Sequence, residues 1–206
     1  MCVLCSLCGC GPTERGEFNR EALLNLKSDA MNEQAPNEYV VKFRTSAGEF
    51  TLAVTRGHAP LGADRFYNLV MNGFYDEQRF FRVVPGFVVQ FGIHGDPEIS
   101  ATWREANIKD DPVKASNRRG TIAFAKSNQP HSRTSQVFIN FNDNVHLDRM
   151  GFAAFGEVTD GMATIDGINS RHEQKPDQGQ IQYRGNAYLQ EAFPDLDYIL
   201  SARVVR

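Results

Sequence analysis

Alternation of apolar and polar residues predicts a series of short strands. Residues 39–44 and 50–54 alternate on either side of a Ser-Ala-Gly-Glu turn, a pattern typical of a β-hairpin. Further β-branched and aromatic runs lie at residues 79–92, 121–125, 136–141, 152–158 and 198–205. Strands outnumber every other predicted element, so the pattern indicates a mainly β protein.

Helical spacing of apolar residues is clear in only two places. Residues 60–72 repeat apolar side chains every three to four positions, with Pro60 near the start and Gly73 just past the end. The second helix is predicted to begin at Asp160, as an N-cap, and to run to about Ile168. Many strands and two helices favour a mainly antiparallel closed sheet, most simply a barrel plugged at its ends by the helices.

Three stretches lack a periodic pattern. Residues 11–37 are predicted to be mostly linker, with a short helix near residues 19–30. Residues 93–119 read as a long surface loop, and residues 171–196 are polar and interrupted by proline, so no helix is predicted there. The organisation expected is a leader and linker over residues 1–37 and one domain over residues 38–206.

The run at residues 79–92 carries an unusual polar residue. Pro85-Gly86 breaks this run into two short strands joined by a turn. Side chains two apart on a strand share a face, so Arg82 lies among apolar neighbours. A guanidinium keeps its charge and is costly to bury unpaired. Arg82 must therefore extend to solvent, pair with a carboxylate or bind a ligand.

Three sequence blocks resemble the cyclophilin-type peptidyl-prolyl cis-trans isomerases. The first is Phe-x-Arg-Val-x-Pro-Gly-Phe-x-x-Gln, from Phe80 to Gln90. The second is Gly-Thr-Ile-Ala-Phe-Ala at residues 120–125 with Ser-Gln-Val-Phe-Ile at 135–139, and the third spans residues 147–162. Their order and spacing are similar to the family's from about Glu38 to Arg206. The resemblance implies an eight-stranded antiparallel barrel capped by two helices, and an isomerase acting on X-Pro bonds.

The resemblance also implies a role for individual residues. Arg82 matches the family's catalytic arginine, and Gln90 would bind the substrate carbonyl or steady Arg82. The positions that match the proline pocket and the groove beside it are Phe87, Val88, Ala125, Lys126, Gln136, Phe138, His146 and Leu147. Prolyl isomerisation needs neither a nucleophile nor a metal, so no cofactor is expected.

Some residues differ from the best-known eukaryotic pattern of the family. Phe81 stands where histidine is common, Val88 where methionine is, and Phe91 where glycine is. His146 stands where a tryptophan often lies, and it lacks the large ring and the indole donor. We therefore expect weak binding of the cyclic peptide drug cyclosporin.

Composition narrows the class of partner. The formal net charge is −3 over 206 residues, which gives no reason to expect a nucleic-acid partner. No run approaches the roughly 20 apolar residues of a membrane-spanning helix. The expected partners are proline-containing peptides and unfolded proteins, and the chain is expected to be a monomer.

All the cysteines lie in the first ten residues: Cys2, Cys5, Cys8 and Cys10. Their close spacing is compatible with a metal or iron–sulfur site, although nothing nearby supplies a scaffold. Leu7-Cys8-Gly9-Cys10 also resembles a bacterial lipobox, which would make Cys10 a lipid anchor. A periplasmic or membrane-anchored lipoprotein is therefore favoured over a cytoplasmic protein, with a plain leader as the alternative.

Other functions have weaker support in the sequence. Ser135, His146 and Asp148 are the residue types of a serine hydrolase, but no G-x-S-x-G motif is present. Four histidines without the spacing of metal ligands are His94, His131, His146 and His172. The serious alternative is a module that binds prolyl peptides without isomerising them. Retention of both Arg82 and Gln90 favours the enzyme.

Overall fold

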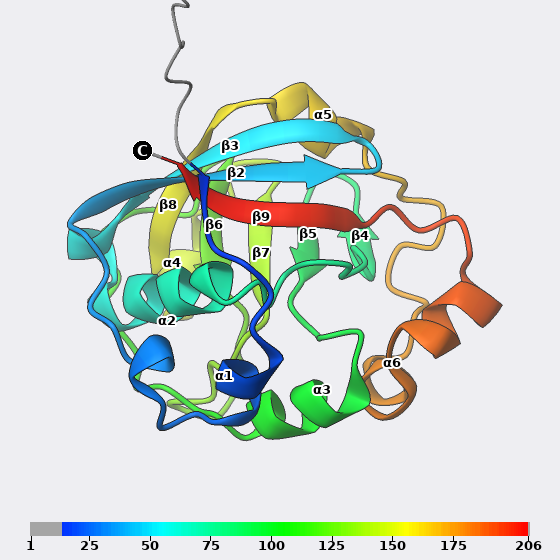
Figure 1. Cartoon of the computed structure of the whole chain (residues 1–206). Coiled ribbons are helices and arrows are strands. Elements are labelled where there is room, and N and C mark those ends of the chain that lie inside the picture. Colours follow the sequence, from blue (N-terminus) through cyan, green and yellow to red (C-terminus); the bar gives the residue numbers. More distant parts are fainter. Residues whose placement is uncertain (1–13, 206) are drawn as a thin grey trace, which may run out of the picture.

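The computed structural model describes residues 14–205, and its framework is one nine-stranded sheet (Figure 1). The strands are β1 (Glu14–Arg15), β2 (Glu38–Thr45), β3 (Gly48–Thr55), β4 (Arg82–Val84), β5 (Val88–Phe91), β6 (Thr121–Phe124), β7 (Val137–Asn140), β8 (Ala154–Asp160) and β9 (Ile199–Val205). Their order is β1-β9-β2-β3-β8-β6-β7-β5-β4, and all the pairs are antiparallel. The prediction of a mainly antiparallel β fold is confirmed.

The two ends of the sheet are joined by isolated bonds rather than by a ladder. An isolated bridge pairs Arg79 with Tyr198. Next to it, the N–H of Phe80 donates to the carbonyl of Asp197 at 3.0 Å, and the N–H of Ile199 donates to the carbonyl of Gln78 at 2.9 Å. The expected closed eight-stranded barrel is therefore not what the ladder forms, since the ordered pairing has nine strands and ends at β1 and β4.

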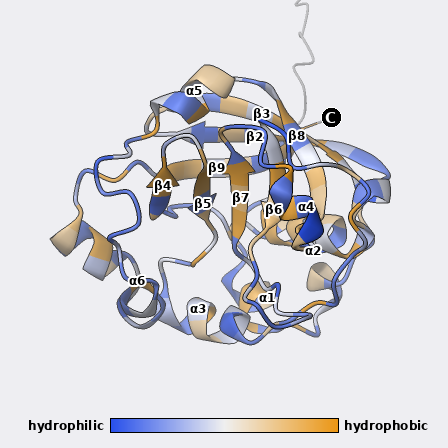
Figure 2. Ribbon diagram, turned by 180° about the vertical axis from the view of Figure 1, so that it is seen from behind, coloured by the Kyte–Doolittle hydropathy of each residue, from blue (hydrophilic) through white to orange (hydrophobic). Residues whose placement is uncertain are grey.

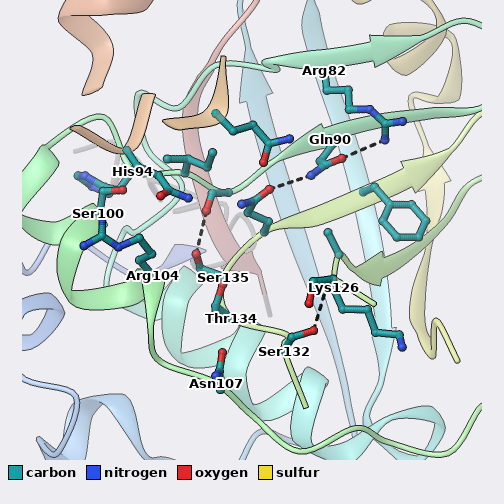
Figure 3. A pocket seen from close by; sticks show the side chains of 18 of the residues that line it. Arg82, Gln90, His94, Ser100, Arg104, Asn107, Lys126, Ser132, Thr134 and Ser135 are labelled. Atoms are coloured by element: carbon teal, nitrogen blue, oxygen red, sulfur yellow. Dashed lines mark hydrogen bonds between the residues drawn. The ribbon is translucent and has the colours of Figure 1, made fainter. Parts of the chain in front are cut away.

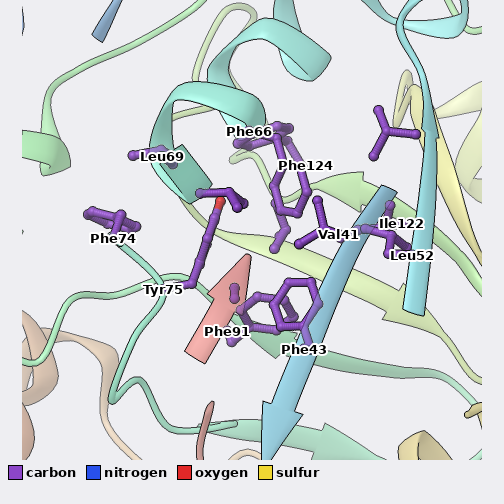
Figure 4. Packing of buried hydrophobic residues seen from close by; sticks show 14 of the residues in the cluster. Val41, Phe43, Leu52, Phe66, Leu69, Phe74, Tyr75, Phe91, Ile122 and Phe124 are labelled. Carbon is purple, nitrogen blue, oxygen red and sulfur yellow. The ribbon is translucent and has the colours of Figure 1, made fainter. Parts of the chain in front are cut away.

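The predicted hairpin is confirmed as β2 and β3, whose buried residues alternate with partly buried ones. The helix α2 (Pro60–Met71), also predicted, packs against the inner face of the sheet. Phe66 of α2 lies 5.2 Å from Phe155, centroid to centroid, and Phe43 of β2 stacks on Phe50 of β3 at 4.5 Å. Figure 4 shows this core between the helix and the strands. Figure 2 shows the corresponding contrast between the hydrophobic strand β7 and the more hydrophilic outer loops.

The number of helices is larger than the sequence pattern indicated. Besides α2, the described residues contain α1 (Arg20–Leu24), α3 (Pro97–Arg104), α4 (His146–Arg149), α5 (Met162–Gly167), α6 (Gln178–Ala192) and the 3₁₀ turns η1 (Asp29–Met31) and η2 (Arg56–His58). The helices α3 and α6 lie side by side below the sheet (Figure 1).

The prediction of a loop over residues 93–119 is therefore wrong for Pro97–Arg104, which form α3. The side chain of Asp96 accepts a hydrogen bond from the N–H of Glu98 at 2.8 Å and caps α3. Ile99 and Trp103 of α3 are buried. A helix with only two large apolar residues gives too weak a periodic signal to detect.

The segment at residues 171–196 also differs from the prediction, because it contains α6. The side chain of Asp177 caps this helix by accepting from the N–H of Gln180 at 2.7 Å. Gly185 interrupts it with a φ of 58° and lies against the backbone carbonyl of Gly95, where a Cβ atom would not fit. The kink interrupts the 3.6-residue repeat of apolar side chains, so the sequence pattern does not indicate a helix here.

The helix α5 begins one residue later than predicted. Gly161 with φ of 80° is its N-cap, and no side chain caps the helix, so the predicted cap at Asp160 is wrong. A Cβ atom on Gly161 would lie 2.4 Å from the carbonyl oxygen of Glu49. The close approach of β3 therefore requires glycine where a helix cap would otherwise carry a side chain.

Residues 14–37 pack on the domain instead of forming a loose linker, and α1 (Arg20–Leu24) lies where the short helix near residues 19–30 was predicted. β1 pairs with β9 through Glu14 and Val205. Leu23 of α1 is buried, and its carbonyl accepts a hydrogen bond from Nε1 of Trp103 at 2.8 Å. The domain boundary at residues 37 and 38 stays a prediction.

The cysteine cluster and the lipid anchor predicted at Cys10 lie outside the described residues. Between residues 14 and 205, none of the helices has the length and apolar content of a membrane span. The same residues contain no group of three His, Cys, Asp or Glu side chains placed to hold a metal ion.

Candidate active site

A line of polar side chains crosses β4, β5 and the start of β7 (Figure 3). Arg82 pairs with Gln90 in the β4–β5 ladder, so both side chains point to the same face of the sheet. Nη1 of Arg82 donates to Oε1 of Gln90 at 3.1 Å, and Nε2 of Gln90 donates to Oε1 of Gln136 at 2.8 Å. The ladder and the turn at Pro85-Gly86 therefore bring three of the predicted residues together.

Arg82 is half-buried and makes two further contacts. Its Cζ atom lies 5.6 Å from the ring centroid of Phe87, a distance suited to a cation–π interaction. Its Nε atom donates to Oε1 of Gln174, from the segment before α6, at 3.3 Å. Partial burial lowers the pKa of the Arg82 guanidinium from its ordinary value. Within residues 14–205, Nη2 makes no hydrogen bond.

An apolar compartment lies beside this polar line. Val88 of β5, Ala123 of β6, Phe138 of β7 and Leu147 of α4 are buried in one cluster. Phe87, Ala125 and Phe152 are partly buried and pack against it. The predicted pocket residues Phe87, Val88, Ala125, Phe138 and Leu147 are thus brought together. The compartment offers apolar surface and no charge, as the ring of a proline requires.

Lys126 and His146 lie at the edges of this compartment. Lys126 follows β6 and places its Nζ atom 5.5 Å from the ring centroid of Phe152. Its backbone N–H and C=O make no hydrogen bond within the described residues, so both are free to pair with an extended peptide. His146 is exposed and stacks on Phe87, with ring centroids 6.2 Å apart. His146 is therefore at the rim and does not line the cavity.

A second, polar compartment was missed by the sequence analysis. It continues the same cavity, of about 690 Å³, past Gln136. Its polar lining includes Ser100, Arg104, Asn107, Gln129, Ser132 and Thr134. They come from α3, the turn after it and the loop between β6 and β7. No local sequence pattern signals that these segments meet.

His94 lines this polar compartment and is buried. Its Nδ1 atom accepts a hydrogen bond from the N–H of Asp96 at 2.9 Å, so the neutral ring carries its proton on Nε2. That Nε2 atom has no hydrogen-bond partner within residues 14–205. Burial, opposed by the Asp96 and Asp76 charges, lowers the pKa of His94 to about 4. The imidazole is therefore neutral at pH 7.

The hydrolase alternative has no support in the geometry. The hydroxyl of Ser135 donates to the carbonyl of Gly92 at 2.8 Å. Asp148 accepts from the N–H of Asn117 at 2.9 Å and from the hydroxyl of Ser116. His146 stacks on Phe87. The three candidate triad residues have separate partners and do not form a nucleophile–base pair.

Comparison with known proteins decides the family. The family model described as "Cyclophilin type peptidyl-prolyl cis-trans isomerase/CLD" matches residues 40–184, well over half of the chain. The chain belongs to this family. The resemblance predicted from the three sequence blocks is confirmed, and with it the class of enzyme.

Curated relatives of this chain are also named as peptidyl-prolyl cis-trans isomerases. Peptidyl-prolyl cis-trans isomerase A of Dickeya dadantii is 40% identical over 135 residues, which is 63% of this chain and 70% of the relative. Peptidyl-prolyl cis-trans isomerase B of Escherichia coli is 34% identical over 137 residues, covering 63% of this chain and 83% of the relative. These bacterial relatives support a peptidyl-prolyl cis-trans isomerase.

A solved structure supports the fold. The cyclophilin-type isomerase of Cryptosporidium parvum superposes with a TM-score of 0.61, covering 81% of this chain and 97% of that one, at 20% identity. Another crystal of this isomerase, obtained in the presence of the dipeptide Ala-Pro, gives a TM-score of 0.60. At this identity the similarity bears on the fold alone.

Proposed function

We propose that this isomerase accelerates rotation about X-Pro bonds without covalent chemistry, by a hydrogen bond from Arg82 to the imide nitrogen in the twisted transition state. The observation that carries the proposal is the position of Arg82. Its guanidinium is held by Gln90, and Nη2 has no partner within residues 14–205. The apolar compartment of Val88, Phe138 and Leu147 lies beside it.

The physical reason is the electronic change at the imide nitrogen. Amide resonance sets a barrier of roughly 18–20 kcal/mol, and rotation removes that resonance. The nitrogen then becomes pyramidal and regains a lone pair that can accept a hydrogen bond. A donor aimed at this atom binds the transition state more strongly than the ground state, and each 1.4 kcal/mol or so gained is worth about tenfold in rate.

Arginine suits this task better than other donors. It stays charged, and its planar guanidinium carries five N–H donors in a fixed fork. Two of these donors bond Gln90 and Gln174, which leaves three for a substrate: both on Nη2 and the second on Nη1. Partial burial of the guanidinium shields its hydrogen bonds from water, which strengthens them.

The remaining site residues would hold the peptide. The proline ring enters the apolar compartment and is bound by burial alone. The backbone of Lys126 pairs with the extended chain, and Gln90 either binds the substrate carbonyl or steadies Arg82. Proline-containing peptides and unfolded proteins are the substrates, with broad tolerance of the residue before proline because backbone and ring supply the contacts.

Two finer features of the whole chain belong to the same proposal. The sheet acts as a closed barrel, whose two ends are joined by the hydrogen bonds from Phe80 to Asp197 and from Ile199 to Gln78. Slow hydrogen exchange at the amides of Phe80 and Ile199 would support the closure. The protein is a monomer, which light scattering tests. A lipid anchor at Cys10 and a periplasmic location stay predictions, because Cys10 lies outside the described residues.

The rate of cis-to-trans conversion of a short Ala-Pro peptide tests the function. We expect the wild-type protein to accelerate it and Arg82→Ala to lose at least about tenfold while remaining folded. If wild type is no faster than buffer but still binds the peptide, the protein is a binding module instead. If Arg82→Ala is as fast as wild type, the proposed role of Arg82 is wrong.

A further inference from the structure

A short segment between α5 and α6 runs along the outer edge of β4. The carbonyl of Glu173 accepts a hydrogen bond from the N–H of Val83 at 2.9 Å. β4 pairs with β5 on its other side and is the last strand of the ladder, so this bond occupies an edge amide. The next residue, Gln174, extends its side chain to Nε of Arg82 at 3.3 Å.

The segment is tied down on the side away from Arg82. Nε2 of His172 lies 2.6 Å from Oδ1 of Asp195, and Nδ2 of Asn169 donates to the carbonyl of Asp195 at 2.7 Å. The ring of His172 packs edge-on against Phe193, with centroids 5.0 Å apart. These contacts fix the backbone from which Gln174 projects.

The strand and the segment also share an apolar cluster. Phe81, directly before Arg82, is buried with Ile181 and Leu189 of α6 and with Leu196. Neighbouring residues on a strand point to opposite faces, so Phe81 anchors α6 while Arg82 faces the cavity. Gln174 precedes α6 by only a few residues, and α6 packs on Phe81, the neighbour of Arg82. The position of Gln174 is therefore linked to the backbone that carries Arg82.

We propose that Gln174 is a positioning residue that, together with Gln90, sets the orientation of the Arg82 guanidinium. This inference rests on the proposed role of Arg82. A single hydrogen bond from Nη1 to Gln90 leaves the guanidinium free to swing about that contact. A second acceptor at Nε fixes the plane of the fork, and the Nη2 donors then have one direction. Orientation of this kind raises the rate because the reacting groups are aligned before the barrier is crossed.

The exposure of the Gln174 side chain distinguishes a role in positioning Arg82 from a role in stabilising the fold. The side chain of Gln174 is exposed, and Arg82 is its hydrogen-bond partner. Its loss removes no buried packing, so the fold should be unaffected. A net hydrogen bond of ordinary strength corresponds to a roughly threefold to tenfold effect, and we expect that effect in the rate.

Substitution of Gln174 by residues of similar length tests the inference. Gln174→Met removes the acceptor, and Gln174→Glu retains one. We expect Gln174→Met to lower kcat about threefold to tenfold, with KM within about twofold of wild type and Tm unchanged. Gln174→Glu should restore kcat to within about twofold of wild type. Gln190→Met is the matched control, because Gln190 is also an exposed glutamine but lies on α6, and it should leave kcat unchanged.

Two further measurements distinguish this inference from the proposed role of Arg82. In nitrogen-15 NMR, the Arg82 Nε–H signal should exchange faster with water in Gln174→Met than in wild type. In an Arg82→Ala background, Gln174→Met should have no further effect on the rate. If Arg82→Ala alone loses nothing, the proposed function fails. If Arg82→Ala loses activity and Gln174→Met equals wild type, or Gln174→Glu is as slow as Gln174→Met, only the positioning role is overturned.

Discussion

The two compartments of the cavity differ in how the chain builds them. The apolar one is formed mainly by neighbouring strands, where the ladder fixes Val88 and Phe138 on one face of the sheet. The polar one is formed by α3 and by the loop after β6. In Figure 3, Ser100 and Arg104 of α3 lie on the far side of the view from Arg82, and Ser132 of the loop lies below. Strand register supplies the proline pocket, while contacts between distant segments supply the polar walls.

Different forces hold the two compartments. Burial of apolar surface holds the first, as the packing of Phe138 on Phe152 at 5.6 Å illustrates. Next to the second is a buried ion pair, whose Arg133 lies in the chain between the lining residues Ser132 and Thr134. Arg133 donates through Nη1 to Asp111 at 3.1 Å and through its backbone carbonyl accepts from the N–H of Ile108 at 2.9 Å. The comparison predicts that the two compartments respond differently to substitution and to pH.

Phe138→Ala should have the largest effect, because it removes a buried ring from the apolar compartment. The free energy of unfolding should fall by about 3–5 kcal/mol, and KM for an Ala-Pro peptide should rise. Urea denaturation and steady-state kinetics below the melting temperature measure the two quantities. Phe138→Leu keeps an apolar side chain and should cost less than half as much. An alanine variant that binds the peptide as well as wild type would contradict a pocket held by burial.

Acidification should weaken the polar compartment through His94. Burial lowers the folded-state pKa of this imidazole to about 4, below its ordinary value, so on acidification the unfolded state takes up the proton first. The contribution of His94 is fully present above about pH 6.5 and is lost as pH falls towards 4, amounting to about 3 kcal/mol. Urea denaturation between pH 4 and pH 7 measures it.

The control for that titration is His94→Gln, which lacks a titrating ring. The difference in unfolding free energy between wild type and this variant should depend on pH across the same window. Parallel pH profiles for the two proteins would show that His94 is not the group responsible.

His146→Trp should strengthen cyclosporin binding, from a weak starting affinity. His146 lies exposed over Phe87 at the rim of the apolar compartment. An indole there adds apolar surface and an N–H donor, and we expect a gain of about tenfold, or 1.4 kcal/mol. Calorimetric titration measures both affinities. A nanomolar dissociation constant for the wild-type protein would refute the expectation.

Arg104→Ala should have the smallest effect. Its Nε atom lies 3.7 Å from Oε1 of Glu105 and its Cζ atom 5.1 Å from the ring of Tyr183, both partners outside the apolar compartment. On a short Ala-Pro peptide, kcat/KM should stay within about threefold of wild type, which is below 0.7 kcal/mol. A tenfold loss would mean that the two compartments act as one in catalysis.

The same contrast explains how much the sequence could predict. Period-two alternation and the motif from Phe80 to Gln90 predicted β2, β3, β4 and β5 and the residues around Arg82, because those contacts follow from local pattern and strand pairing. The helix α6 was missed because Gly185 interrupts its repeat. Gln174 was missed because its contact with Arg82 joins residues 92 positions apart, which no local pattern encodes.

The conversion rate of a bound peptide is the sharpest test of the role of Arg82, because it separates the catalytic step from the affinity for the peptide. Exchange NMR at saturating protein gives the cis–trans rate within the complex, and titration gives the dissociation constant. Arg82→Lys keeps the charge but removes the planar fork. We predict an affinity within about threefold of wild type and a bound-state rate at least about tenfold lower. An unchanged bound-state rate in Arg82→Lys would contradict transition-state stabilisation by the Arg82 guanidinium.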